Sequence, residues 1–300
     1  MSVTASVPSN LPNSSTEKAP RSHFRDAWRR LLRSWNGRVG LLIISLTILI
    51  GVLAPVFDHY DPTTDSNLAQ ARFAPSFDHP FGTDRLGRDV FRRIVHGTRI
   101  SLMIGFVVVF FTSITGTVLG LIAGYFGKAL DTVIMRIMDI LLAFPSILLA
   151  IAIVAVRGPG VLNTILAVAI VGVPGYARVV RSMVLSLRER DYVDAARMIG
   201  VSDLRIMFFH ILPNSLSPII VQMTLGVGGA ILFAAALGFL GLGVQPPAPE
   251  WGAMISDGIP FLRQSPHLVF FPGMAIMLTV LGFNLLGDGL RDALDPQLRD

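Results

Sequence analysis

The stretch RERDYVDAARMIGVSDLRIMFFHILPN, residues 188–214, lies between two long apolar runs. Runs of that length cross a bilayer, so the charged stretch between them is expected in water at a membrane surface. Its first part, residues 188–199, has the composition of a helix. Gly200 is the residue best suited to the left-handed conformation that stops a helix. The pattern therefore predicts a helix that ends at Gly200.

A second, short helix is predicted directly after the first. Ser202 and Asp203 favour a helix start, because their side-chain oxygens accept hydrogen bonds from the free N–H groups there. The helix is expected to end at Pro213, which has no N–H and disfavours helix in the residue before it. An aqueous loop seldom carries so many apolar side chains: Leu204, Ile206, Met207, Phe208, Phe209 and Ile211. This apolar surface could be buried either in the lipid headgroup layer or in a groove of a cytosolic protein, and the sequence alone does not decide between them.

The same stretch resembles the EAA loop of ABC importer permeases, whose pattern is E-A-A-x3-G-x9-I-x-L-P. Asp194 stands in place of the glutamate and keeps its charge, and His210 stands where the pattern has isoleucine. The ending HILP is similar to that of the peptide-importer branch. The resemblance implies contact with a cytosolic ATPase, with Phe208 and Phe209 filling a groove in that partner. The residues it assigns to this contact are Asp194, Ala195, Ala196, Gly200, Ser202, Phe208, Phe209, Leu212 and Pro213.

Composition independently points to a membrane protein. Of the 300 residues 52% are hydrophobic and 15% charged, whereas soluble domains carry about a quarter charged residues. The chain has no cysteine, which excludes disulfides, iron–sulfur clusters and thiol zinc sites. The formal charge of +5 could suggest nucleic acid, but the basic residues lie mostly beside apolar runs. They are better interpreted as determinants of membrane topology.

The apolar runs predict an all-α membrane protein with six transmembrane helices. Residues 1–38 are expected to form a disordered tail followed by a basic, partly amphipathic stretch on the cytosolic face. A first span at 39–57 precedes an extracytoplasmic loop at 58–98, a transmembrane core at 99–290 and a cytosolic tail at 291–300. The other five spans are predicted at 100–126, 133–156, 162–180, 216–242 and 272–286.

Glycines and prolines give these spans their expected shapes. Gly116, Gly120 and Gly124 clear one helix face for the close approach of another backbone. The glycines of the fifth span, at 226, 228 and 229, are equally suited to close packing. Pro174 is expected to interrupt the fourth span, and Pro145 to kink the third.

Two charges lie inside the predicted third span. A charge at the centre of a bilayer costs about 2.5–3.5 kcal/mol, so Arg136 and Asp139 are expected to pair at i, i+3 or to lie near the interface. Contact with the transported substrate is the alternative. Arg136, Asp139 and Pro145 are therefore the candidates for the translocation path.

The distribution of positive charge predicts the orientation. Six spans place both termini on one side of the membrane, and 16 Lys and Arg residues fall on that side, against eight on the other. The positive-inside rule then places both termini, and the 188–214 stretch, in the cytosol. This agrees with a contact to a cytosolic ATPase.

Three further stretches resemble the dipeptide/oligopeptide/nickel permease branch of ABC importers, C-type subunit, over residues 79–298. They are HPFGTDRLGRDVFRRIVHGTR from His79, LGFLGLGVQPPAPEWGAMISDG from Leu237 and NLLGDGLRDALDP from Asn284. Taken by themselves, the charges at 84, 85, 88 and 89 are expected to pair among themselves. The paired prolines and Trp251 are expected to form a rigid interfacial turn.

This resemblance implies the type I importer permease fold in a bacterial inner membrane. It also implies a second, related permease, two cytosolic ATPases that hold ATP and magnesium, and an extracytoplasmic binding protein that commonly selects the substrate. This chain itself would be non-catalytic and bind no cofactor and no metal. Dipeptides or oligopeptides are the expected cargo, with glutathione or nickel as alternatives within the same architecture.

An active site of its own is not expected in this chain. Gly127-Lys128-Ala129 is not a phosphate loop, because position 122 is Ile and Ala129 lacks the hydroxyl that binds magnesium. The six histidines are scattered, and no convincing nucleophile–base set is found. The alternative from another class is an ion-coupled secondary carrier with Asp139 and Arg136 as a proton relay, although no clear internal repeat supports it.

Overall fold

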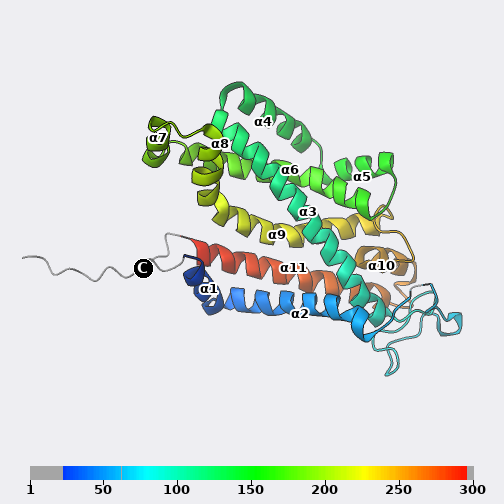
Figure 1. Cartoon of the computed structure of the whole chain (residues 1–300). Coiled ribbons are helices and arrows are strands. Elements are labelled where there is room, and N and C mark those ends of the chain that lie inside the picture. The colour runs from blue at the N-terminus through cyan, green and yellow to red at the C-terminus, as the bar shows by residue number, and fades with distance from the viewer. Residues whose placement is uncertain (1–22, 62, 296–300) are drawn as a thin grey trace, which may run out of the picture.

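The computed structural model describes residues 23–61 and 63–295, which form a bundle of helices with one isolated β-bridge between Thr83 and Asp89 (Figure 1). The predicted all-α architecture is confirmed for this part of the chain; the predicted tail before residue 23 and residues 296–300 lie outside it. The α-helices are α1 His23–Arg33, α2 Trp35–Phe57, α3 Val90–Phe126, α4 Lys128–Ala143, α5 Ser146–Arg157, α6 Val161–Leu187, α7 Asp191–Met198, α8 Asp203–Arg205, α9 Leu212–Phe239, α10 Trp251–Gly258 and α11 His267–Leu294. Shorter turns are 3-10 helices at Leu68–Gln70 and Ile259–Phe261 and the π-helix η2 at Ile206–Ile211.

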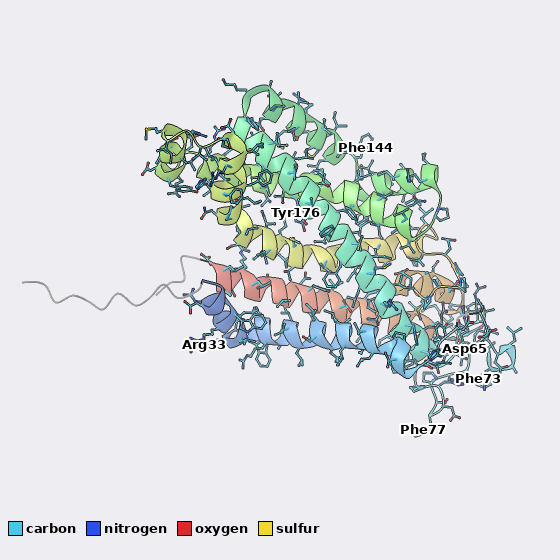
Figure 2. The ribbon with its side chains drawn as sticks, in the orientation of Figure 1. Arg33, Asp65, Phe73, Phe77, Phe144 and Tyr176 are labelled. Carbon is cyan, nitrogen blue, oxygen red and sulfur yellow. The ribbon has the colours of Figure 1, made fainter. Side chains whose placement is uncertain are left out.

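Five helical segments are long and apolar enough to cross a membrane, and a bent pair of helices makes a sixth. The bent pair is α4 and α5, which meet at an angle of 91°. Phe144, labelled in Figure 2 beside the bend, is extended (φ −89°, ψ 138°), as expected for a residue that precedes a proline. The predicted bend at Pro145 is confirmed, but it separates two helices instead of kinking the single helix expected at 133–156.

The long helix α3 is packed along α6 through its glycines. A Cβ added to Gly120 would come within 2.6 Å of the Ala177 carbonyl oxygen, and one added to Gly124 within 2.7 Å of the Val184 Cβ. The predicted close approach at 116, 120 and 124 is confirmed. Helix α3 also starts ten residues before the predicted span, where the Asp89 carboxylate accepts a hydrogen bond from the Arg92 N–H.

Two of the other small-residue predictions need correction. Helix α6 continues through Pro174, which is buried, so the predicted interruption of this span is wrong. A proline within a span is tolerated where packing against neighbouring helices holds the segment together. In α9, Gly226 and Gly228 pack closely as predicted, but a Cβ at Gly229 would meet nothing within 4 Å.

The bundle has two distinct ends. Helices α1, α7 and α8 lie at one end with the C-terminal end of α11, and α10 lies at the other with the loop of residues 58–89 (Figure 1). The main apolar core runs between α3, α6, α9 and α11. A separate small core lies beneath α7 and η2; its buried members are Leu121, Tyr125, Val180, Val184, Val193, Ala196, Ile206, Met207, Ile211 and Ile219.

Candidate functional site

The first helix of the 188–214 segment ends as predicted. Gly200 has φ +80°, the left-handed conformation, and follows α7 directly. Its N–H donates to the Arg197 carbonyl at 3.0 Å, and the Val201 N–H donates to the Ala196 carbonyl at 3.0 Å. This pair of bonds is the Schellman helix ending, which satisfies the last carbonyls of α7.

The second helix does not end at Pro213, which corrects the prediction. Residues Ile206–Ile211 widen into a π-helix, in which the Leu212 N–H donates to the carbonyl of Met207, and α9 follows without a break. Pro213 thus falls in the first turn of α9, and because the helix continues from η2, its missing N–H leaves a gap in the hydrogen-bond ladder there. Ser202 occupies the N-cap position of α8, yet its side chain makes no capping hydrogen bond.

The segment has two faces of opposite character. Ile206, Met207 and Ile211 are buried in the small core beneath it. Phe208 is 45% exposed and Phe209 73% exposed. Large apolar side chains that remain this open in a folded segment mark a contact with lipid or with another protein.

Most other residues assigned to this contact by the resemblance also lie at the surface: Asp194, Ala195, Gly200, Ser202 and Pro213 are exposed. Ala196 is buried and Leu212 half-buried, so they support the segment from below. The Asp194 carboxylate accepts a hydrogen bond from Arg197 at 3.1 Å, three residues along α7. Both side chains stay largely exposed, so the carboxylate remains accessible to a partner.

The path candidates do not pair as predicted. Asp139 binds Arg178 of α6 at 2.5 Å rather than Arg136 on its own helix. A second ion pair, Asp131 with Arg181, joins the same two helices. Arg136 is exposed, and no ion pair joins it to another residue within the described part of the chain. The i, i+3 pair is replaced because α4 packs on α6, whose arginines reach both carboxylates.

A cavity of about 310 Å³ lies among α3, α5, α6 and α9. Its wall includes Thr112, Ser146, Tyr176 and Gly229. Ser146 follows Pro145 directly, so the break between α4 and α5 brings this hydroxyl into the wall; Arg136 and Asp139 do not line the cavity. Tyr176, labelled in Figure 2 at mid-length of the bundle, donates its hydroxyl to the Gln222 carbonyl at 3.1 Å.

A buried charge cluster, which the sequence predicted only in part, lies at the other end of the bundle. The Asp84 carboxylate accepts hydrogen bonds from Arg88 at 2.7 Å and Arg93 at 2.6 Å, and all three side chains are nearly inaccessible. Arg93 also approaches Asp257 at 4.0 Å. We call these four residues the Asp84 cluster.

The predicted pairing among residues 84, 85, 88 and 89 is correct only for Asp84 with Arg88. Arg85 pairs with Asp257 at 3.5 Å and Asp89 with His79 at 2.7 Å. The charges face different elements, because the loop folds back on α10 and on the start of α3. The signal available in the sequence was the adjacent pair Arg92-Arg93 just before an apolar run.

Helix α10 packs into the same end of the bundle. Trp251 is buried and donates its indole N–H to the Ile94 carbonyl at 3.1 Å, so the predicted interfacial position of this side chain is wrong. The Glu250 carboxylate accepts hydrogen bonds from the Gly252 and Ala253 N–H groups and starts α10. Burial raises the pKa of Glu250, against the opposite effect of those two hydrogen bonds.

Comparison with known proteins assigns this chain to a protein family. Residues 116–300 match the family described as binding-protein-dependent transport system inner membrane component, and residues 22–75 match the N-terminal transmembrane domain of oligopeptide transport permease C. The dipeptide transport system permease protein DppC of Alkalihalophilus pseudofirmus is 54% identical over 97% of this chain and 95% of its own. The glutathione transport system permease protein GsiD of Pectobacterium atrosepticum is 47% identical over 94% of each chain.

Among solved structures, the inward-facing MetNI methionine ABC transporter contains a similar chain. The likeness has a TM-score of 0.56 at 20% sequence identity and covers 68% of this chain and 97% of that one. At that identity the likeness concerns the fold, which is the type I importer permease fold expected from the sequence. Together with the family match over residues 116–300 and the relatives above, it shows that this chain belongs to the binding-protein-dependent transport system inner membrane components.

Proposed function

We propose that this chain is one of the two membrane-spanning permease subunits of an ABC importer for dipeptides and other short peptides. Its relatives carry names for dipeptide and glutathione transport, and glutathione is itself a short peptide. The alternative of nickel has no observation in its favour: the described residues hold no group of three His, Cys, Asp or Glu suited to a metal. An ion-coupled carrier would need Asp139 as a relay, and that carboxylate is already bound to Arg178.

The observation that carries the proposal is the two-faced 188–214 segment. Its inner face is anchored in its own small core, and its outer surface exposes Phe208 and Phe209 in η2 as well as Asp194 in α7. Lipid would cover the aromatic rings but would not favour the carboxylate. A protein groove with a basic rim accommodates both. We therefore assign this face to a cytosolic ATPase subunit.

The remaining partners follow from the same assignment. A second, related permease completes the membrane domain, two ATPases hold ATP and magnesium, and an extracytoplasmic binding protein delivers the peptide. The chain resides in a bacterial inner membrane with both termini in the cytosol, as the positive-inside rule predicts. This subunit is non-catalytic and needs no cofactor of its own; its task is to convert movement of the ATPases into alternating access.

The cavity lined by Thr112, Ser146 and Tyr176 is our candidate for the part of the peptide path in this subunit. Its wall offers hydroxyl groups and the bare backbone surface of Gly229, which suit the amides of a peptide. A larger groove of about 770 Å³ between α2, α3, α9 and α11 has Thr224 as its one polar residue. That groove suits lipid or another apolar helix better than a peptide.

The test is cross-linking in the cysteine-free background of this chain. Phe208→Cys, co-expressed with the second permease and the ATPases, is expected to cross-link to an ATPase subunit. Phe77→Cys is the matched control, because this phenylalanine is fully exposed in the loop at the opposite end of the bundle (Figure 2). A membrane-impermeant thiol reagent applied outside is expected to label only the control position.

Two results would contradict the proposal. An assembled complex in which Phe208→Cys gives no cross-link to an ATPase places that face against lipid. Labelling of Phe208→Cys from outside the cell would reverse the orientation, and with it the assignment of the partner.

A further inference from the structure

The 188–214 segment is attached to the membrane helices by three routes. Two are covalent, through α6 before it and α9 after it. The third is a set of side-chain contacts to the last turn of α3, between residues 78 and 64 positions apart in the sequence. Which route carries movement depends on how stiff each one is.

The route to α9 contains a weak point. The π-helical turn Ile206–Ile211 has a hydrogen-bond register different from that of the α-helices on either side. Pro213 follows at the start of α9 and contributes no N–H to the ladder. A change of register next to a missing donor lets a helix bend there at low cost.

The route to α3 is built from close polar contacts. The Tyr125 hydroxyl donates to the Asp203 carboxylate at 2.6 Å, and the Arg197 guanidinium lies 5.5 Å from the centre of the Tyr125 ring. At the residue just before Tyr125, the Arg188 guanidinium donates to the Gly124 carbonyl at 2.9 Å. Tyr125 therefore contacts both short helices of the segment, α7 through Arg197 and α8 through Asp203.

Tyr125 is also firmly held on the membrane side. It is 7% exposed and belongs to the small core together with Val193 of α7 and Ile206 of η2. The glycine face of α3 presses this helix against α6 just before Tyr125, so the last turn of α3 has no room to yield separately. At the opposite end, 37 residues of continuous helix begin beside the Asp84 cluster.

We propose that Tyr125 is a positioning residue that transmits displacement of the 188–214 segment to α3, and through α3 to the far end of the membrane domain. This inference rests on the proposed function, since it presumes that an ATPase displaces the segment. The hydrogen bond from Tyr125 to Asp203 is short, at 2.6 Å, and charge-assisted, and it joins a buried tyrosine to an exposed carboxylate. Charge-assisted bonds are stronger than neutral ones, which makes this contact a stiff link. The π-helical turn before α9 serves as the joint that allows the segment to move with α3.

The test is Tyr125→Phe in the complete importer, reconstituted in vesicles with a labelled dipeptide and ATP. The variant keeps the ring and its packing and removes only the hydroxyl. We expect assembly and ATP hydrolysis to stay near wild type, while dipeptide transported per ATP hydrolysed falls about tenfold, the effect of losing one hydrogen bond to a charged group. Tyr60→Phe is the matched control, because the Tyr60 hydroxyl is buried without a hydrogen-bond partner among the described residues.

Asp203→Asn, and the double variant with Tyr125→Phe, separate a link from a general structural role. If the two residues act as one link, the double variant transports about as much per ATP as either single variant. An unchanged ratio in Tyr125→Phe, or effects that multiply in the double variant, would overturn the inference; if Tyr125→Phe fails to assemble, an unchanged ratio in Asp203→Asn overturns it too. Failure of the proposed function looks different, because the wild-type complex itself would then not transport the dipeptide.

Discussion

The two ends of this molecule handle charge in opposite ways. In the Asp84 cluster, one carboxylate binds two arginines, and all three side chains are nearly inaccessible. In the 188–214 segment, Asp194 pairs with Arg197, but the two side chains are 60% and 41% exposed. A buried pair cannot lose one partner without leaving an uncompensated charge, whereas an exposed pair exchanges its partner for water or protein at little cost. The cluster is thus built to hold one geometry and the segment to accept a new contact.

The largest effect is expected from neutralising the centre of the cluster. Asp84→Asn leaves the buried Arg88 and Arg93 short of a negative charge, and breaking such an arrangement costs about 3–5 kcal/mol. The yield of folded protein in detergent and its thermal midpoint, followed by fluorescence-detected size exclusion, should both drop sharply. Asp78→Asn in the same loop is the control, because this exposed carboxylate has no ion pair among the described residues. Equal stability of the two variants would show that the burial of the cluster is unimportant.

A smaller effect is expected at Gly200, where the segment depends on backbone shape. A β-branched residue at φ +80° is strained by its backbone whatever space surrounds it, and nothing lies within 4 Å of a Cβ there. Gly200→Val should leave the protein inserted and assembled, while transport and the coupling of ATP hydrolysis to transport fall about tenfold. The Phe208→Cys cross-link should weaken in parallel.

Gly200→Asn sharpens this test, because asparagine tolerates the left-handed conformation far better than valine. It should retain most of the transport. If asparagine proves as damaging as valine, the contribution of Gly200 is a contact with the partner rather than the helix ending seen here.

Between the two ends, Gly229 tests the cavity itself. A Cβ at this position meets no atom within 4 Å, so Gly229→Leu should fold normally and fill part of the space beside Tyr176. We expect several-fold less dipeptide transport, and a greater loss for a tripeptide. Gly273→Leu in α11 is the control, since its Cβ also has open space but does not line the cavity. Similar transport by both variants would remove this cavity from the peptide path.

Much of this architecture could be predicted from the sequence, because hydropathy and glycine spacing are local signals. Five of the spans, the glycine face of α3 and the helix ending at Gly200 all follow from residues close together in the chain. The π-helical turn could not be predicted in the same way. The residues at 206–211 suit an α-helix equally well, and the change of register depends on Pro213 and on packing against the small core.

The charge contacts were harder still, because they join distant parts of the chain. Arg85 and Asp257 are 172 positions apart, and Asp139 found its partner on α6 rather than one turn away on α4. The i, i+3 rule considers only residues one turn away on the same helix, so it predicted an ion pair between Asp139 and Arg136. Trp251 was misplaced for the same reason, since its hydrogen-bond acceptor, the Ile94 carbonyl, belongs to α3.

The smallest effect is expected at Glu250, a buried carboxylate at the start of α10, without an arginine partner among the described residues. Burial raises the pKa of Glu250 above the ordinary range of a glutamate, so the folded state favours the neutral acid. Its contribution to stability is then complete below the unfolded pKa and is lost as pH rises through the folded pKa. Carboxylates with lowered pKa values, such as Asp58 beside Arg92, act in the opposite direction: their contribution to stability is lost as pH falls.

The measurable quantity is therefore the difference between wild type and Glu250→Gln. Glutamine keeps the shape of the side chain and one acceptor oxygen for the start of α10, so the variant loses some stability at every pH. Between about pH 4 and pH 8, the thermal midpoint of the wild type should move downward relative to that of the variant as pH rises. A difference that stays constant across this range would mean that Glu250 does not titrate there. A difference that grows in favour of the wild type would mean that the two N–H donors outweigh burial and that Glu250 is charged in the folded protein.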